Sequence, residues 1–237
     1  MNILQETFTI DPRSLPEQVA DKIEELIINQ TFKVGEKIPT EPELASTLNI
    51  GRSTVREAIK ILAARNILEV RRGFGTFVCQ NIGISDDPLG FRFESNQKKL
   101  ALDLCEIRRM IEPNLAYLAA IHATYQDIEE LQTLCNEVSE LIKKKQNYGH
   151  KDTEFHTKIS QCTNNLVVPR LVPIINTAID TYIGITNSSL AGQAIMEHQQ
   201  IVDAICCHDP ESAKDAMENH LAANKKTLEA LQEIKNF

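Results

Sequence analysis

Residues 40–78 constrain the fold of this 237-residue chain more than any other stretch. They read TEPELASTLNIGRSTVREAIKILAARNILEVRRGFGTFV. Thr40 can cap a first helix, and Glu43, three residues later, can complete a capping box. Residues 49–51 (Asn-Ile-Gly) form a turn long enough to swing a second helix across the first. A ribbon with a glycine-bearing tip follows, so the order predicts a helix-turn-helix with a β-wing.

The second predicted helix separates apolar from polar side chains. Its apolar stripe consists of Val55, Ala58, Ile59 and Leu62. Its first turns carry Arg52, Ser53, Thr54 and Arg56. A helix that buries one stripe and offers hydroxyl and guanidinium groups is typical of a reader of the DNA major groove. Arg72 and Gly73 lie at the wing tip, where glycine lets the backbone approach phosphate or a minor groove. With Thr40, these residues are the predicted DNA contacts.

Positive charge is concentrated within residues 50–72, in the predicted helix-turn-helix and wing. The formal net charge of the chain is −8, whereas residues 50–72 hold six basic and two acidic residues. An acidic body argues against indiscriminate binding to polyanions. A local basic patch on that body favours a sequence-specific DNA-binding protein.

The remaining sequence predicts a mainly α protein in two domains. A helix over residues 15–30 completes a winged helix-turn-helix domain at 1–78, and residues 79–98 lose periodicity and read as a linker. Residues 99–237 predict an antiparallel all-α bundle of about six helices. Its first helix continues past Pro113 and counts Ile107 and Met110 in its apolar stripe; its second has Asp127 as its cap. The others fall near 150–162, 167–188, 191–208 and 211–235, with Asp209 capping the last.

Cysteine usage and the first residues indicate the compartment. Six cysteines are scattered without a CxxC pair, at positions 79, 105, 135, 162, 206 and 207. Most read as small buried hydrophobic residues in a reducing environment. The chain opens with polar MNILQET and has no apolar run of about 18 residues. The expected location is the cytoplasm, with no membrane partner.

Three histidines of the bundle lie in apolar stripes on three different helices. Asp152 and His156 are four residues apart and share one helix face. His198 and His220 fall in the stripes of the last two helices. A buried imidazole cluster is costly without partners, which favours a metal site, although a hydrogen-bonded core histidine is the ordinary alternative. The other histidines, at 122, 150 and 208, read as surface groups near helix ends.

The N-terminal domain resembles the winged helix-turn-helix of the GntR family of bacterial regulators. The family's G-x-x-L-P-[ST]-E entry appears at 35–41, its R-x-T-V-R-E-A recognition helix at 52–58, and its G-x-G-T-F-V wing at 73–78. Pro42 stands where the family usually places an arginine, so one DNA contact implied by the resemblance is missing. Gly51 replaces the usual serine cap.

Residues 99–235 resemble the FCD effector domain of the FadR branch of that family. The shared pattern is Arg108…Glu112, Asp152-x-x-Phe155-His156, Asn165, Glu197-His198 and His220-Leu221, with Asn164 where the family usually has glycine. The resemblance implies that Asp152, His156, His198 and His220 hold a divalent cation, zinc first, with nickel or manganese as alternatives. A small carboxylate effector or water would complete its shell, and Arg108 would offer a bidentate fork to such a carboxylate. The alternative for Arg108 is an ion pair with Glu112 within the helix.

These observations predict a homodimeric transcription regulator, a repressor rather than an activator. A small carboxylate at the metal would bias the spacing of two recognition helices on a pseudo-palindromic DNA operator. One alternative is a mononuclear metal hydrolase that uses the same four side chains, but HExxH and a separate general base are absent from the sequence, so no enzyme is expected. The other is a metal-stabilised DNA-binding protein that responds to no ligand.

Overall fold

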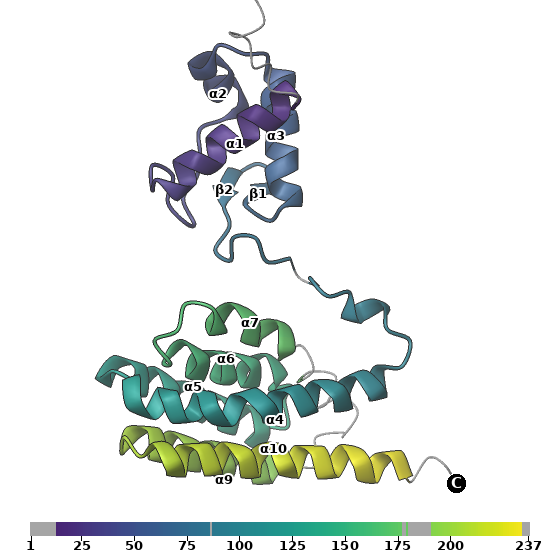
Figure 1. Ribbon diagram of the computed structural model, residues 1–237, viewed down its shortest axis with the longest axis vertical. Coiled ribbons are helices and arrows are strands. Elements are labelled where there is room, and N and C mark those ends of the chain that lie inside the picture. Colours follow the sequence, from purple (N-terminus) through teal and green to yellow (C-terminus); the bar gives the residue numbers. More distant parts are fainter. Residues whose placement is uncertain (1–12, 86, 177–178, 180–190, 234–237) are drawn as a thin grey trace, which may run out of the picture. The chain divides into compact units, whose positions relative to one another are not determined.

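The computed structural model describes residues 13–85, 87–176, 179 and 191–233. The chain forms two compact units, Met1–Asp86 and Asp87–Phe237, and each is described by itself (Figure 1). The boundary falls inside the stretch expected to be a linker. A short 3-10 helix, η2 (Phe91–Phe93), follows the boundary. None of the helices in the described ranges is long and apolar enough to cross a membrane.

The first unit is a winged helix-turn-helix, as predicted. It contains α1 (Leu15–Ile28), α2 (Glu41–Leu48), α3 (Arg52–Ala64), β1 (Leu68–Arg71) and β2 (Gly75–Val78). The strands pair antiparallel, from Leu68 opposite Val78 to Arg71 opposite Gly75, and they form the wing. The predicted stripe of α3 is confirmed, since Val55, Ala58, Ile59 and Leu62 are all buried. They share one core with α1 and with Leu68 and Val78.

Local chemistry explains where α2 begins and ends. The carboxylate of Glu43 accepts hydrogen bonds from the backbone N–H of Thr40 at 2.8 Å and from its hydroxyl at 2.7 Å. Pro42 lies in the first turn, where its missing N–H has no helical partner to lose. Asn49 ends the helix with φ of 53°, a left-handed conformation that asparagine tolerates. The turn then places Gly51 as the N-cap of α3.

The second unit is helical throughout its described elements. They are α4 (Gln97–His122), α5 (Tyr125–Lys143), α6 (Gly149–Gln161), α7 (Val168–Ile175), α9 (Ala191–Cys206) and α10 (Pro210–Glu233). Pro113 lies within α4 without ending it, and Asp209 caps α10 by accepting from the N–H and hydroxyl of Ser212. The part of the predicted 167–188 helix beyond 176 falls outside the described residues, apart from residue 179.

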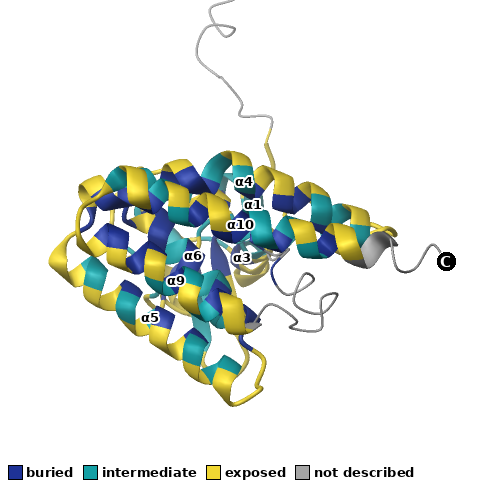
Figure 2. Ribbon diagram, turned by 90° about the horizontal axis from the view of Figure 1, so that it is seen from below, coloured by how far each residue is buried: buried dark blue, intermediate teal, exposed yellow. Residues whose placement is uncertain are grey.

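The long helices α4 and α10 run antiparallel and carry much of the core (Figure 1). Near the start of α4, the Cys105 thiol donates to the Leu221 carbonyl at 3.9 Å; near its end, Ala120 O lies 2.7 Å from His208 Nδ1. The buried positions face the interior of the bundle (Figure 2). The central cluster includes Leu131, Phe155, Ile159, Ile201, Met217 and Leu221.

Two sequence expectations about the bundle are wrong: the cap of α5, and the core position of two residues on α4. Helix α5 begins before Asp127, because Thr124 is its cap and Asp127 closes the capping box from the third helical position. Ile107 and Met110 are 39% and 61% exposed, since they lie on the side of α4 away from the core.

The cysteine expectation holds only in part. Cys105, Cys135 and Cys162 are buried, but Cys79 is half-buried, and Cys206 and Cys207 are exposed where α9 ends and the turn to α10 begins. Composition alone could not separate a cysteine in a core stripe from one at a helix end.

Candidate nucleic-acid interface and metal centre

The predicted DNA contacts lie on one unit and are accessible. Arg52, Ser53 and Arg56 are exposed on the first turns of α3, and Thr54 is half-buried beside them. Thr40, Arg72 and Gly73 are also exposed, at the start of α2 and at the wing tip. Each position therefore leaves its polar group free of the core.

Two arginines near this surface already have protein partners. Arg56 Nε and NH2 lie 3.0 and 2.9 Å from Glu41 Oε2, which ties α3 to the first turn of α2. Arg71 pairs with Glu69 at 2.7 Å and stacks over the ring of Phe77, 4.5 Å from its centroid. Among the described residues, Arg52 and Arg72 make no ion pair, so their guanidinium groups are available for phosphate or base edges.

The three predicted histidine ligands meet inside the second unit. His156 from α6, His198 from α9 and His220 from α10 each offer a ring nitrogen, and these atoms lie within 4.8 Å of one another. All three residues are at most 2% exposed. Asp152, one turn before His156, places Oδ1 3.4 Å from His198 Nε2 and Oδ2 3.8 Å from His156 Nε2. The structure thus brings the three histidines together and places Asp152 beside two of them, His156 and His198.

This donor set fits a divalent cation. Two ligand atoms each about 2.1 Å from one metal lie roughly 3.0–3.5 Å apart at common coordination angles, close to the Asp152–His198 separation. Among the residues that the structure describes, neither ring nitrogen of His198 finds a hydrogen-bond partner, although both are buried. Such orphaned polar atoms cost free energy unless something binds them. Burial, then the neighbouring His220 and His156, hold the pKa of His198 well below its usual value, so the ring is neutral, as a metal ligand must be.

Two carboxylates orient the other two imidazoles. Glu112 Oε2 lies 2.7 Å from His156 Nδ1, and Glu197 Oε2 lies 2.9 Å from His220 Nδ1. The Glu197–His220 contact is a hydrogen bond, whereas His156 Nδ1 faces the Glu112 carboxylate as a close charge contact without hydrogen-bond geometry. A carboxylate that accepts from Nδ1 fixes the Nδ1–H tautomer and leaves Nε2 as the ligand atom, an arrangement typical of metal-binding histidines. The tautomers follow from these contacts rather than from observed protons.

Arg108 makes the intrahelical ion pair that its sequence spacing allowed. Its Nε donates to Glu112 Oε1 at 2.6 Å and its NH2 to Oε2 at 3.3 Å, with both residues buried. Burial acts to raise the pKa of Glu112, but the positive charge of Arg108, with the contacts that the carboxylate makes to Arg108 and His156, holds it below its usual value. Arg108, Glu112 and His156 therefore form one continuous chain from α4 to the histidine cluster.

Sequence reasoning missed some of these partners. Glu112 and Glu197 belong to the family motifs, but no role at a histidine could be predicted for them. Asn224, whose Nδ2 lies 3.3 Å from His220 Nε2, was not predicted at all. Neither was Asn176, which is fully buried and whose amide finds no hydrogen-bond partner among the described residues. The one available signal was the i,i+4 spacing of His220 and Asn224.

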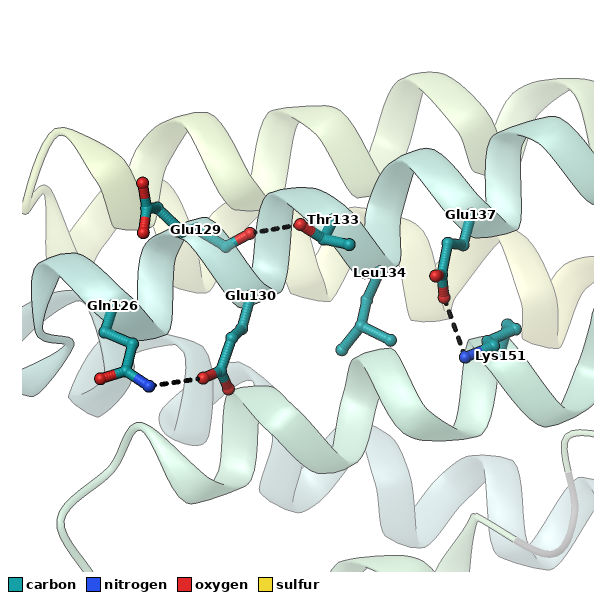
Figure 3. Close-up of a pocket in the computed structure, with 7 residues that line it drawn as sticks. All are labelled: Gln126, Glu129, Glu130, Thr133, Leu134, Glu137 and Lys151. Atoms are coloured by element: carbon teal, nitrogen blue, oxygen red, sulfur yellow. Dashed lines mark hydrogen bonds and ion pairs between the residues drawn. The ribbon is translucent and has the colours of Figure 1, made fainter.

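A groove on the outer side of α5 and α6 is separate from this cluster. Figure 3 shows its lining: Gln126, Glu129, Glu130, Thr133, Leu134, Glu137 and Lys151. It has a volume of about 520 Å³ and contains none of the predicted ligands. Lys151 pairs with Glu137 at 2.8 Å and with Glu154 at 2.7 Å, so its charge is already balanced. The groove is therefore an open surface whose lysine is already paired within the protein.

Comparison with known families covers both units. The family described as "Bacterial regulatory proteins, gntR family" matches residues 15–78, and the FCD domain matches residues 103–223. These matches coincide with the winged unit and with the bundle that holds the histidine cluster. Asn164, which stands where the FCD pattern usually has glycine, has φ of 55°. The side-chain oxygen of Asn165 accepts from the backbone N–H groups of Val167 and Val168, where α7 begins.

Similar proteins and structures agree with those matches. The Uxu operon transcriptional regulator of Escherichia coli (strain K12) is 31% identical, over 90% of this chain and 86% of its own length. The Exu regulon transcriptional regulator of the same strain is 30% identical, over 92% and 86%. A solved structure, Streptococcus agalactiae GntR, has a TM-score of 0.76 and 35% identity, covering 89% of this chain and 99% of that one. These relatives are regulators rather than enzymes, and the chain belongs to the GntR family of DNA-binding transcription regulators, with an FCD effector domain.

Proposed function

We propose that this regulator binds a divalent cation through Asp152, His156, His198 and His220, and that a small carboxylate at the cation changes its affinity for DNA. The observation that carries the proposal is the convergence of three buried imidazoles beside a carboxylate, two of which, His156 and His198, find no hydrogen-bond partner for either ring nitrogen among the described residues. An apolar core would not assemble such a group without a partner for its nitrogens.

A bound cation would supply open coordination positions for a carboxylate oxygen. Three imidazoles and one carboxylate suit zinc first, and they also suit nickel or manganese. Within the protein, Glu112 and Glu197 hold the rings of His156 and His220 in place. These residues position the ligand nitrogens before any cation arrives.

Arg108 is the proposed contact for the carboxylate effector. Its Nε–NH2 edge is engaged by Glu112, which in turn contacts His156. An anion that competes for Arg108 would therefore disturb the support of a metal ligand. Binding energy at one site can bias a two-state arrangement of the bundle, and by linkage the same bias alters DNA affinity.

The DNA-binding surface is proposed to consist of Thr40, Arg52, Ser53, Thr54, Arg56, Arg72 and Gly73. One α3 helix covers only part of a usual operator, so we propose a homodimer on a pseudo-palindromic site. The exposed residues Ile107, Met110 and Ile121 lie along one side of α4 and offer an apolar surface to a second copy. We propose that this dimer acts as a cytoplasmic repressor, with residues 1–78 as the DNA-binding part, 79–98 as linker, and 99–237 as the metal, effector and dimer part.

Operator binding measured with and without candidate acids tests the coupling. A duplex selected from a random-sequence library by the wild-type chain would serve as the operator, and a panel of small mono- and dicarboxylic acids as effectors. At least one acid should change wild-type affinity fivefold or more and have no effect on the His198→Ala variant. The proposal fails if every acid leaves the metal-loaded wild type unchanged, which would favour a ligand-independent regulator.

A further inference from the structure

Phe74 stands at the outermost turn of the wing. Its backbone N–H donates to the Arg71 carbonyl at 3.0 Å, and Gly73 has φ of 78° at the third position of that turn. A positive φ at this position is typical of a type II turn. The turn projects Phe74 away from the ribbon, and its side chain is 71% exposed.

The base of the tip is fixed while Phe74 itself is not packed. Arg71 is bound to Glu69 and stacked on Phe77, and β1 and β2 are paired up to Arg71 and Gly75. Among the described residues, Phe74 belongs neither to the core cluster of the winged unit nor to any ring pair. The backbone at the tip is thus held in place, while the ring of Phe74 remains exposed.

Isolated exposed apolar residues are common and usually mean little. The setting of Phe74 is different, because it lies between groups suited to phosphate. Arg72 precedes it and pairs with no acidic group among the described residues, and the end of the Lys37 side chain fills the space beside Gly75 where a Cβ would lie. A ring flanked by cations matches a minor groove, whose edges are phosphates and whose floor is stacked bases.

We propose that Phe74 enters the DNA minor groove beside the bases read by α3 and wedges partly between two base pairs. The inference rests on DNA binding by α3 and extends it to the deformation of the duplex. Apolar wedges of this kind unstack a base step and bend DNA toward the major groove. Because pyrimidine–purine steps unstack most easily, Phe74 would add a preference for such a step at a position that no hydrogen bond reads.

The test compares variants of the full chain on one selected duplex. The duplex comes from selection by the wild-type chain on a random-sequence library, and its bend is measured by energy transfer between dyes at its ends. Phe74→Ala should bind five- to thirtyfold more weakly and lose most of the bend, whereas Phe74→Leu should keep much of both. Val70→Ala is the matched control, because Val70 is 56% exposed on β1 but away from the tip.

The salt dependence separates a wedge from a phosphate contact. Removing Phe74 should leave the slope of log affinity against log salt unchanged, whereas Arg72→Ala should reduce it by about one. A straight wild-type complex, or equal binding and bending by Phe74→Ala and wild type, would overturn the wedge. So would a Phe74→Ala variant that loses dimer mass but bends DNA normally, since Phe74 would then contact a second copy. If selection with the wild-type chain yields no preferred sequence, the proposed sequence-specific binding by α3 is wrong, and this outcome is distinct from failure of the wedge alone.

Discussion

Glu197 Oε2 lies 2.9 Å from Nδ1 of His220, a residue on another helix, although the neighbour of Glu197 in the sequence is His198. The contact joins α9 to α10 beside the histidine cluster. Through this contact Glu197 orients the imidazole of His220, and Glu197 is not itself one of the proposed cation ligands. The effect of Glu197 on metal affinity can be measured.

Glu197→Gln is expected to weaken metal binding ten- to a hundredfold without removing it. An amide still contacts the ring but no longer favours the Nδ1–H tautomer as a carboxylate does. Competition with a metal-sensitive dye would give the affinity. Glu218→Gln, an exposed change on α10, is the control and should match wild type. Equal affinities for Glu197→Gln and wild type would show that Glu197 does not support the site.

Arg52→Ala and Arg56→Ala should each weaken specific DNA binding at least tenfold. Forked contacts to a base are worth about 1–3 kcal/mol each. The Arg56–Glu41 pair is exposed and contributes little to folding stability, so the thermal melt should barely move. Lys60→Ala, an exposed cation farther along α3, is the control. Wild-type affinity in both arginine variants would remove them from the interface.

The winged unit was largely predictable because its signals are local. A capping pair such as Thr40 and Glu43, or a stripe such as Val55 to Leu62, is contained in one element. The bundle was less predictable from the sequence, because the periodicity of a helix does not say which of its sides a neighbouring helix covers. Ile107 and Met110 fit the spacing of a core stripe and yet are exposed. Likewise, the four ligands could be proposed from their stripes, but the pairing of Glu197 with His220 depends on how α9 and α10 pack.

Asp127 should contribute stability that depends on pH. Asp127 accepts hydrogen bonds from Lys158 and Thr124, and these bonds, that from Lys158 first, lower its pKa to about 2, although burial acts to raise it. A lowered pKa means that the stabilisation is present above the unfolded value near 3.8 and is lost as the pH falls toward 2. Asp127→Asn should therefore unfold about 1 kcal/mol more easily at pH 7.

Denaturant unfolding at pH 7 and pH 3 would check this. The gap between wild type and Asp127→Asn should narrow at the lower pH. Asp215→Asn, an exposed carboxylate on α10, should show no comparable gap at either pH. A gap that stays constant with pH would mean that the charge of Asp127 contributes little.

Met110→Lys is expected to break the homodimer. The residue is 61% exposed on the apolar side of α4, and a charge there would have to be desolvated in a contact between copies. Light scattering should give about twice the 26.7 kDa chain mass for wild type and about one chain mass for the variant. Met196→Lys, at 64% exposure on α9, should remain dimeric. A dimeric Met110→Lys would place the contact elsewhere.

The metal content of the purified chain tests the central claim most directly. Elemental analysis after dialysis without chelator, and after reconstitution with zinc, nickel and manganese, should find about one ion per wild-type chain. His198→Ala and Asp152→Ala should lose most of it, and His150→Ala, an exposed histidine on α6, should retain it. No ion in the wild type under any of these conditions, or equal content in wild type and His198→Ala, would contradict the metal-dependent account.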